Sequence, residues 1–219
     1  MIKIEHTDTY GFDHAVRGAR NPMNSWDKSD SYWEYRDDVE FEDGEQYVNR
    51  IRMEYVIGPN DMKLLRNLAT AGPDHGKALR MMVCYADVTG PLYWLKELDT
   101  YRMGVEKNSC STMHKIHSKE FEMADFSHEQ NLFSGTMQIV IDALNSARQN
   151  FLFTAEKVWW YTMIQLLPSS YNQRRTYMFS YAALRTMYHA RKNHKLQEWH
   201  DFCAWIEGLP HSELITAEG

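Results

Sequence analysis

The chain has 219 residues, with 24 lysines and arginines against 30 aspartates and glutamates, which gives a formal net charge of −6. This length can bury a sizeable core without disulfide bonds, and the three widely spaced cysteines offer neither a disulfide framework nor a CxxC zinc knuckle. No apolar run approaches the roughly 18 residues that cross a bilayer, and no export signal is visible. We therefore expect a cytoplasmic protein that forms a single domain over residues 1–219.

The beginning of the chain alternates apolar and polar residues. This pattern over residues 1–8 predicts a first strand. Turn-forming residues accumulate after Arg20 and predict a loop. Residues 33–47 are strongly acidic and predict a solvated face.

The middle of the chain predicts a helix followed by a strand. Apolar residues recur at helical spacing over residues 62–72, directly after the Gly-Pro pair that begins at Gly58. Residues 75–88 place Leu79, Met81, Val83 and Tyr85 on one face, which indicates a central strand.

The remainder of the chain predicts mainly helices. Residues 107–130 have a composition typical of loops and predict a loop. Apolar periodicity predicts helices after Pro91, over 135–150 and 153–167 as a pair, from about 172 to 194, and from 197 onward. The predicted fold class is α+β, with a mixed or antiparallel sheet, strands gathered early and a helix-rich C-terminal half.

The segment from Lys157 to Gln197 holds seven lysines and arginines and no carboxylate, which leaves 17 basic and 30 acidic residues elsewhere. Such an asymmetry favours binding of a small anion at the segment, whereas the acidic remainder would repel a nucleic-acid duplex. A guanidinium donates two parallel hydrogen bonds to a phosphate, so the arginines are the first candidates.

On the predicted helix over 172–194, Arg174 and Arg185 lie three turns apart on nearly one stripe. Arg191 and Lys195 form a second stripe at i and i+4. A purely structural explanation also fits Lys192 and Lys195, because cations near a helix C-terminus interact favourably with the helix dipole.

The spacing of the C-terminal half resembles that of the flavin-dependent thymidylate synthases. In that family an LP pair, a helix and an R-x5-Q motif follow one another, and Pro168, Arg191 and Gln197 match them. Upstream, His75 and Pro91 match the family's histidine and proline on either side of a strand.

The family's RHRxxSxNExSxRY motif corresponds to residues 100–114. Arg102 matches its second arginine, and with a one-residue insertion Asn108 and Ser111 match its asparagine and second serine. The segment from Arg17 to Arg20 resembles the short Ala-Arg segment that follows the family's first strand.

The resemblance implies an enzyme that transfers a one-carbon unit from methylene-tetrahydrofolate to dUMP with FAD and NADPH, as a homotetramer with shared active sites. The implied nucleotide-binding residues are Arg191, Arg102, Ser111, Asn108 and Arg174. Those implied at the cofactor are His75, Tyr101, Ser180, Thr186, Lys195 and Gln197. The family uses no cysteine nucleophile, so Cys110 need not be catalytic.

Two alternatives remain open at this point. The first is a descendant that binds a pyrimidine nucleotide monophosphate without the flavin chemistry, or that modifies C5 differently, since a fold does not fix a function. The second is a metal site among the histidines and glutamates of residues 114–129, although no fixed ligand geometry appears there and no metal is predicted.

Overall fold

The computed structural model describes residues 2–42, 45–72, 74–128 and 134–218. The chain forms two compact units, each assembled from three stretches of sequence. The first comprises Met1–Asp8, Tyr85–Met178 and Ala190–Trp205, and the second comprises Thr9–Cys84, Phe179–His189 and Ile206–Gly219. The single domain over residues 1–219 therefore stays a prediction.

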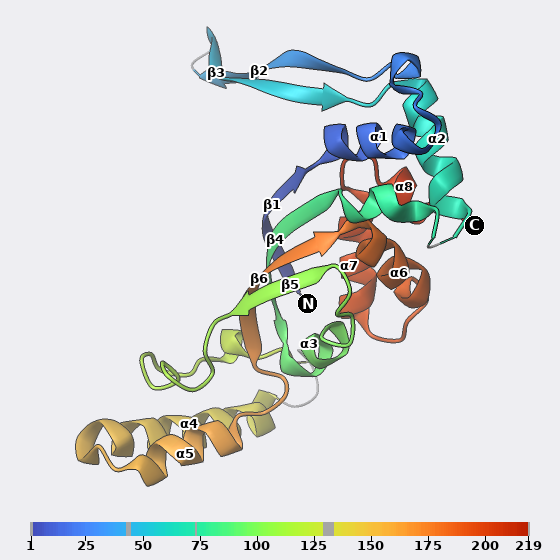
Figure 1. Ribbon diagram of the computed structural model, residues 1–219. Coiled ribbons are helices and arrows are strands. Elements are labelled where there is room, and N and C mark those ends of the chain that lie inside the picture. Colours follow the sequence, from blue (N-terminus) through green and yellow to red (C-terminus); the bar gives the residue numbers. More distant parts are fainter. Residues whose placement is uncertain (1, 43–44, 73, 129–133, 219) are drawn as a thin grey trace. The chain divides into compact units, whose positions relative to one another are not determined.

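A four-stranded sheet in the order β1, β4, β6, β5 belongs mainly to the first unit (Figure 1). Its strands are β1 (Lys3–Tyr10), β4 (Val83–Pro91), β6 (Asn172–Ser180) and β5 (Val105–Ser109). The strand predicted at the start of the chain is confirmed. Strand β5 lies within a stretch that was largely predicted as loop.

The predicted central strand begins later than expected and buries its other face. Residues Gly76–Arg80 form a 3-10 helix, and β4 starts only at Val83. Cys84, Ala86 and Val88 are buried, whereas Tyr85 is exposed. Because side chains alternate between the faces of a strand, the face expected from Val83 and Tyr85 is the more exposed one.

The predicted helix over 172–194 is wrong in its first half, where the chain forms β6 before α6 (Tyr181–Arg191) begins. The alternate side chains of Gln173, Arg175, Tyr177 and Phe179 are buried. Two of these are polar, so the apolar alternation that identifies a half-buried strand is absent from the sequence. A strand this late also contradicts the expectation that strands gather early.

Helices α3 (Leu92–Leu98) and α7 (Gln197–Glu207) confirm predictions. They contribute Trp94, Trp199 and Phe202 to an aromatic core whose side chains are fully buried. The ring centroids of Trp94 and Trp199 lie 5.3 Å apart with an edge-to-face tilt of 64°. This geometry suits the quadrupoles of aromatic rings.

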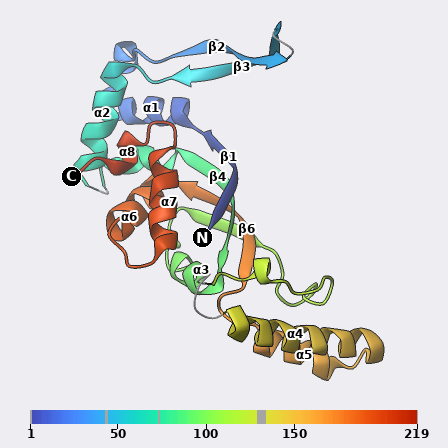
Figure 2. The same cartoon turned by 180° about the vertical axis from the view of Figure 1, so that it is seen from behind.

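The expected helix pair is also confirmed, as α4 (Ser134–Thr154) and α5 (Lys157–Leu166), which lie side by side (Figures 1 and 2). Ile141, Leu144 and Met163 are buried between this pair and the preceding loop, which contributes Phe121 and Phe126. Among the described residues, no helix combines the length and apolarity needed to span a membrane.

The second unit holds α1 (Phe12–Arg20), α2 (Pro59–Thr70), most of α6 and α8 (Glu213–Thr216). The helix α1 is not predicted by the sequence analysis, whereas α2 is. Gly11 precedes α1 with φ of 87°, and a Cβ there would lie 2.3 Å from the carbonyl oxygen of Met81. Only glycine fits this turn.

The acidic stretch belongs to a two-stranded antiparallel hairpin of β2 (Tyr32–Glu42) and β3 (Glu45–Val56). Tyr32 pairs with Val56, and the register shifts between Asp38 and Val39. The solvated face predicted for residues 33–47 depends largely on side chains of residues 36–52, which lie outside the described part.

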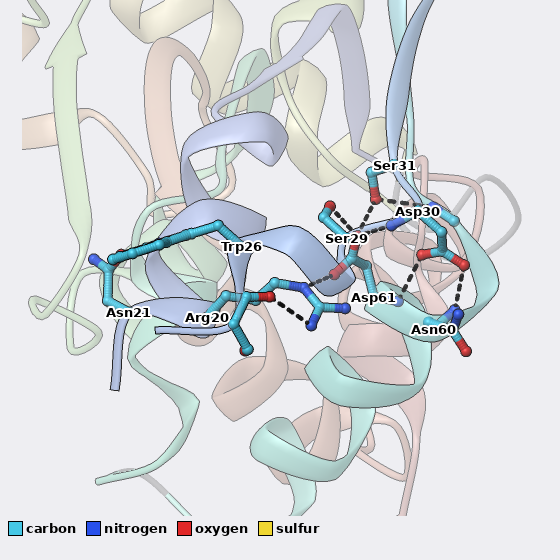
Figure 3. A network of polar contacts seen from close by, with 10 residues as sticks. Arg20, Asn21, Trp26, Ser29, Asp30, Ser31, Asn60 and Asp61 are labelled. Carbon is cyan, nitrogen blue, oxygen red and sulfur yellow. Dashed lines mark hydrogen bonds and ion pairs between the residues drawn. The ribbon is translucent and has the colours of Figure 1, made fainter. Parts of the chain in front are cut away.

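The loop predicted after Arg20 is confirmed, and a buried ion pair holds it in place (Figure 3). The Nε atom of Arg20 donates to Oδ1 of Asp61 at 2.5 Å. The other carboxylate oxygen accepts from the hydroxyls of Ser29 and Ser31 at 2.6 and 2.7 Å and from the backbone N–H of Asp30 at 3.2 Å. Burial acts to raise the pKa of Asp61, but these hydrogen bonds outweigh it and lower that pKa below its ordinary value.

Candidate functional site

Arg191, the last residue of α6, lies in a polar cluster of the first unit. Its Nε donates to the hydroxyl of Tyr101 at 2.9 Å, and its Nη1 lies 3.2 Å from Oε2 of Glu97. Its Cζ lies 4.9 Å from the ring centroid of Trp199 and 5.7 Å from that of Tyr101. The guanidinium is therefore held by one carboxylate, one hydroxyl and two aromatic rings.

Glu97 is the centre of this cluster. Its Oε2 accepts a hydrogen bond from Nε1 of Trp199 at 2.9 Å and lies 3.6 Å from Nε2 of His194. The helix α3 presents Glu97, whereas Arg191, His194 and Trp199 come from the end of α6 and the start of α7. The side chain of Arg191 is 22% exposed to solvent and that of Glu97 is 36% exposed, so a ligand can reach both.

This arrangement has a definite chemical capacity. The partly exposed guanidinium can donate to a phosphate or carbonyl oxygen. Of the two rings beside it, that of Tyr101 is partly exposed and can contact a heterocycle, whereas that of Trp199 is buried. The neighbouring carboxylate offsets the positive charge, so an anion must compete with Glu97 for Arg191.

A second, buried network holds β6 against the segment that follows α3. The guanidinium of Arg175 donates to Asp99 at 2.7 Å, to Gln173 at 2.9 Å and to the hydroxyl of Tyr177 at 3.2 Å. Gln173 in turn donates to the carbonyl of Cys110. Burial raises the pKa of Tyr177 to about 12, so the phenol stays protonated.

The sequence predicted Arg191 for the nucleotide and Tyr101 for the cofactor, and the structure brings the two into contact. The other predicted nucleotide residues do not join them. Arg174 lies on β6 and pairs with Asp87 at 2.5 Å. Hydrogen bonds from Thr176 and Arg174 lower the pKa of Asp87.

Ser111, Asn108 and Arg102 are partly or fully exposed in the segment around β5. The hydroxyl of Ser111 accepts hydrogen bonds from the backbone N–H groups of Met113 and His114 at 3.1 and 2.9 Å. This local turn explains the serine without a ligand.

The expected stripes of Arg174 with Arg185 and of Arg191 with Lys195 do not exist. Arg174 belongs to a strand, and α6 ends at Arg191, so Lys195 lies beyond the helix. Arg185 instead donates to the carbonyls of Leu214 and Ile215 at 3.4 and 3.0 Å. The carboxylate-free segment also finds its ion-pair partners outside itself.

The residues predicted at the cofactor divide between the two units. His75, Ser180 and Thr186 belong to the second unit, whereas Tyr101, Lys195 and Gln197 belong to the first. The buried hydroxyl of Ser180 accepts from the N–H of Ala183 at 3.2 Å, and that of Thr186 donates to the carbonyl of Ala182 at 3.1 Å. His75 and Lys195 are exposed, and the amide of Gln197 donates to Asp201 at 2.9 Å.

Glu97 and Trp199 belong to the site, although the sequence did not predict them there. Glu97 lies outside the basic segment, and no local pattern links it to a residue 94 positions later. The aromatic abundance of the chain is the one signal that could have suggested Trp199. Within the described residues, no three histidine, cysteine or acidic side chains gather to hold a metal, and Glu129 of the predicted loop lies outside that part.

No protein-family model and no curated protein matches the chain in sequence. Solved structures do match it. A thymidylate synthase X (ThyX) from Helicobacter pylori with FAD and dUMP is 17% identical, with a TM-score of 0.70 over 99% of this chain and 98% of that one. A second structure of the H. pylori enzyme, complexed with FAD and dUMP, is 18% identical, with a TM-score of 0.69 over 98% and 97%.

A UMP/dUMP methylase, PolB from Streptomyces cacaoi bound with 5-Br dUMP, is 16% identical, with a TM-score of 0.61 over 100% of this chain and 96% of that one. The chain has the ThyX fold. The α+β class and the fold that the resemblance implied are thereby confirmed. At these identities the ThyX fold is what the comparisons establish, and the activity is a separate question.

Proposed function

We propose that the chain is an enzyme that binds dUMP and modifies its pyrimidine at C5. The observation that carries this proposal is the similarity of fold over nearly the whole chain to the three structures above. Each of those structures contains dUMP or its 5-bromo derivative, whereas FAD is named for two of them. The nucleotide is therefore the better supported ligand.

In this proposal Arg191 is the residue that contacts the nucleotide. Its guanidinium is partly exposed and is oriented by Tyr101 and Glu97. Binding of a nucleotide oxygen would exchange or share the contact with Glu97, at little cost because the pair is partly solvated. Arg102, Asn108 and Ser111 remain proposed contacts from the segment around β5, and Arg174 from β6.

The fuller version follows the resemblance: FAD takes part, NADPH and methylene-tetrahydrofolate are co-substrates, and a cytoplasmic homotetramer of single-domain chains shares its active sites. Three side chains at positions matched to the flavin, those of Ser180, Ala182 and Thr186, do not fit it. The hydroxyl of Ser180 is buried as a cap of α6, that of Thr186 bonds its own helix, and Ala182 offers no polar group. We assign no step to a flavin on these residues.

This misfit favours a second candidate function, a protein that binds a pyrimidine nucleotide monophosphate without flavin chemistry. Thr100 and Tyr101 stand where the resembled family has an arginine and a histidine at the flavin. The hydroxyl of Thr100 donates to the carbonyl of Glu97 at 2.7 Å, and that of Tyr101 accepts from Arg191. Both groups already have partners within the chain.

Two measurements together separate the versions. The absorption spectrum of the purified protein, with and without added FAD, tests for an oxidised flavin band at about 450 nm. Calorimetry with dUMP in the absence of flavin tests the nucleotide site. Nucleotide binding together with a flavin band supports the full reaction, nucleotide binding alone supports the second candidate, and binding of neither contradicts both.

A further inference from the structure

A cavity of about 500 Å³ lies in the second unit, and its lining includes none of the residues proposed for dUMP. Its walls come from α1, from the loop after that helix, and from the adjoining ends of β2 and β3. This volume falls within the range of small-molecule sites, which are typically lined by aromatic side chains and a few polar groups.

Three aromatic side chains line this cavity: Trp26, Trp33 and Tyr55. The tryptophans keep 47% and 50% of their exposure, although large rings are normally buried. Their positions are nevertheless fixed. Nε1 of Trp26 donates to the side chain of Asn21 at 2.8 Å (Figure 3), and the ring centroid of Trp33 lies 5.1 Å from that of Tyr55, its partner in the hairpin register.

The polar lining divides into a rigid part and an accessible part. Arg20 and Ser29 line the cavity and are both bonded to Asp61, so they are held in place and have little capacity left for a ligand. Asp13, His14 and Arg17 come from the exposed side of α1. These three are the groups that a ligand can engage.

The charges on α1 decide the kind of ligand. Arg17 is exposed, and no carboxylate among the described residues pairs with it. The Oδ2 atom of Asp13 lies 3.9 Å from Nε2 of His14. A cage of aromatic rings also suits a quaternary ammonium ion, but the guanidinium of Arg17 in the lining opposes a cation.

We propose that this cavity binds a planar nitrogen heterocycle that carries an anionic group. The ring stacks on Trp26 or Trp33, the anionic group meets Arg17, and Asp13 accepts a ring N–H. Nucleotides and folates share this chemistry. The site does not depend on the proposed reaction, because none of its lining residues is assigned to dUMP.

Calorimetry with dUMP, FAD, NADPH and folate as separate probes tests the proposal and identifies the source of the heterocycle. We expect at least one probe to bind, and Trp33→Ala to weaken it about tenfold because stacking on the ring is lost. Trp33→Phe should stay within about threefold, since phenylalanine keeps a stacking surface. Arg17→Gln should weaken the intact probe about fivefold or more, and leave the uncharged free base of that probe unaffected.

Matched controls are available nearby. Tyr35→Ala removes an exposed ring two residues along β2 that does not line the cavity, and Lys77→Gln removes an exposed cation of the same unit. Neither should change binding. Circular dichroism establishes whether each variant is folded, and Arg17→Gln still decides the question if Trp33→Ala does not fold. The proposal is overturned if no probe binds, if choline binds instead, or if Trp33→Ala and Arg17→Gln bind like the controls.

Discussion

The pairs Arg20–Asp61 and Arg191–Glu97 show two uses of the same chemistry. In the first, both side chains are almost completely buried, with exposed fractions of 7% and 1%. Two hydroxyls and a backbone N–H donate to the second oxygen of the carboxylate. In the second, the side chains keep 22% and 36%, and aromatic rings surround the guanidinium.

Burial and saturation of the partners distinguish a structural ion pair from a candidate binding group. A buried and saturated pair has no exchangeable partner, and breaking it leaves an uncompensated charge. A half-exposed pair beside flat rings can exchange one oxygen for another with little change in free energy. We therefore expect Asp61 to govern stability and Arg191 to govern ligand binding.

The largest effect is expected from Asp61→Ala. Removal of this carboxylate leaves the guanidinium of Arg20 buried without its partner and frees the hydroxyls of Ser29 and Ser31. The free energy of unfolding should fall by about 3–5 kcal/mol, as measured by urea denaturation. Asp27→Ala, in an exposed position of the same loop, should change it by less than about 0.5 kcal/mol. Equal losses in both variants would contradict a structural role for the pair.

The next effect concerns dUMP binding and Arg191. We expect Arg191→Ala to weaken dUMP by about 10- to 100-fold, because a charge-assisted hydrogen bond contributes about 1.5–3 kcal/mol. Arg191→Lys should recover little, since lysine lacks the planar fork and the stacking surface. Lys96→Ala removes an exposed cation from α3 and is the control in calorimetry. Unchanged affinity in Arg191→Ala would remove this residue from the site.

The sequence predicted most of the long helices of the fold but missed a central strand. Helical spacing and prolines correctly predicted α2, α3, the α4–α5 pair and α7, because burial of an apolar stripe determines these elements. Strand β6 was missed because its buried face includes Gln173 and Arg175, which bond the carbonyl of Cys110 and the carboxylate of Asp99 from elsewhere in the fold. A polar network of this kind leaves no periodic signal in the sequence.

The candidate site was predicted only in part, because some of its contacts also leave no signal in the sequence. Motif spacing identified Arg191 and Tyr101, although it assigned them to different ligands. The basic segment contains no carboxylate, and its arginines find their partners Asp87, Asp99 and Glu97 in other segments. Contacts between residues about 90 positions apart depend on topology, which local sequence does not encode.

A smaller effect is expected from Glu97→Gln, which removes the negative charge of the partner of Arg191 and so tests whether that pair can exchange its carboxylate for a ligand. Glutamine can still accept the hydrogen bond from Trp199 through its amide oxygen. Because the carboxylate competes with the anionic nucleotide, dUMP should bind about fivefold more tightly, equivalent to about 1 kcal/mol. Glu120→Gln, in an exposed loop, is the matched control. Weaker dUMP binding in Glu97→Gln would instead indicate that this carboxylate itself contacts the nucleotide.

The smallest expected effect is a loss of folding stability at acid pH. It should depend on Asp61 and not on the pair of Arg191 and Glu97. The pKa of Asp61 is lowered in the folded protein, since hydrogen bonds from Ser29, Ser31 and Arg20 outweigh the cost of burial. A carboxyl with a depressed pKa contributes stability that is fully present above its ordinary value of 3.8 and is lost as the pH falls through its folded value. Urea denaturation from neutral pH down to the acid limit of folding should show this loss in the wild-type chain and a flatter profile in Asp61→Asn, whose amide does not titrate. Arg191→Ala should keep the wild-type slope, and a flattened slope in that variant would show that the two pairs are not energetically separate.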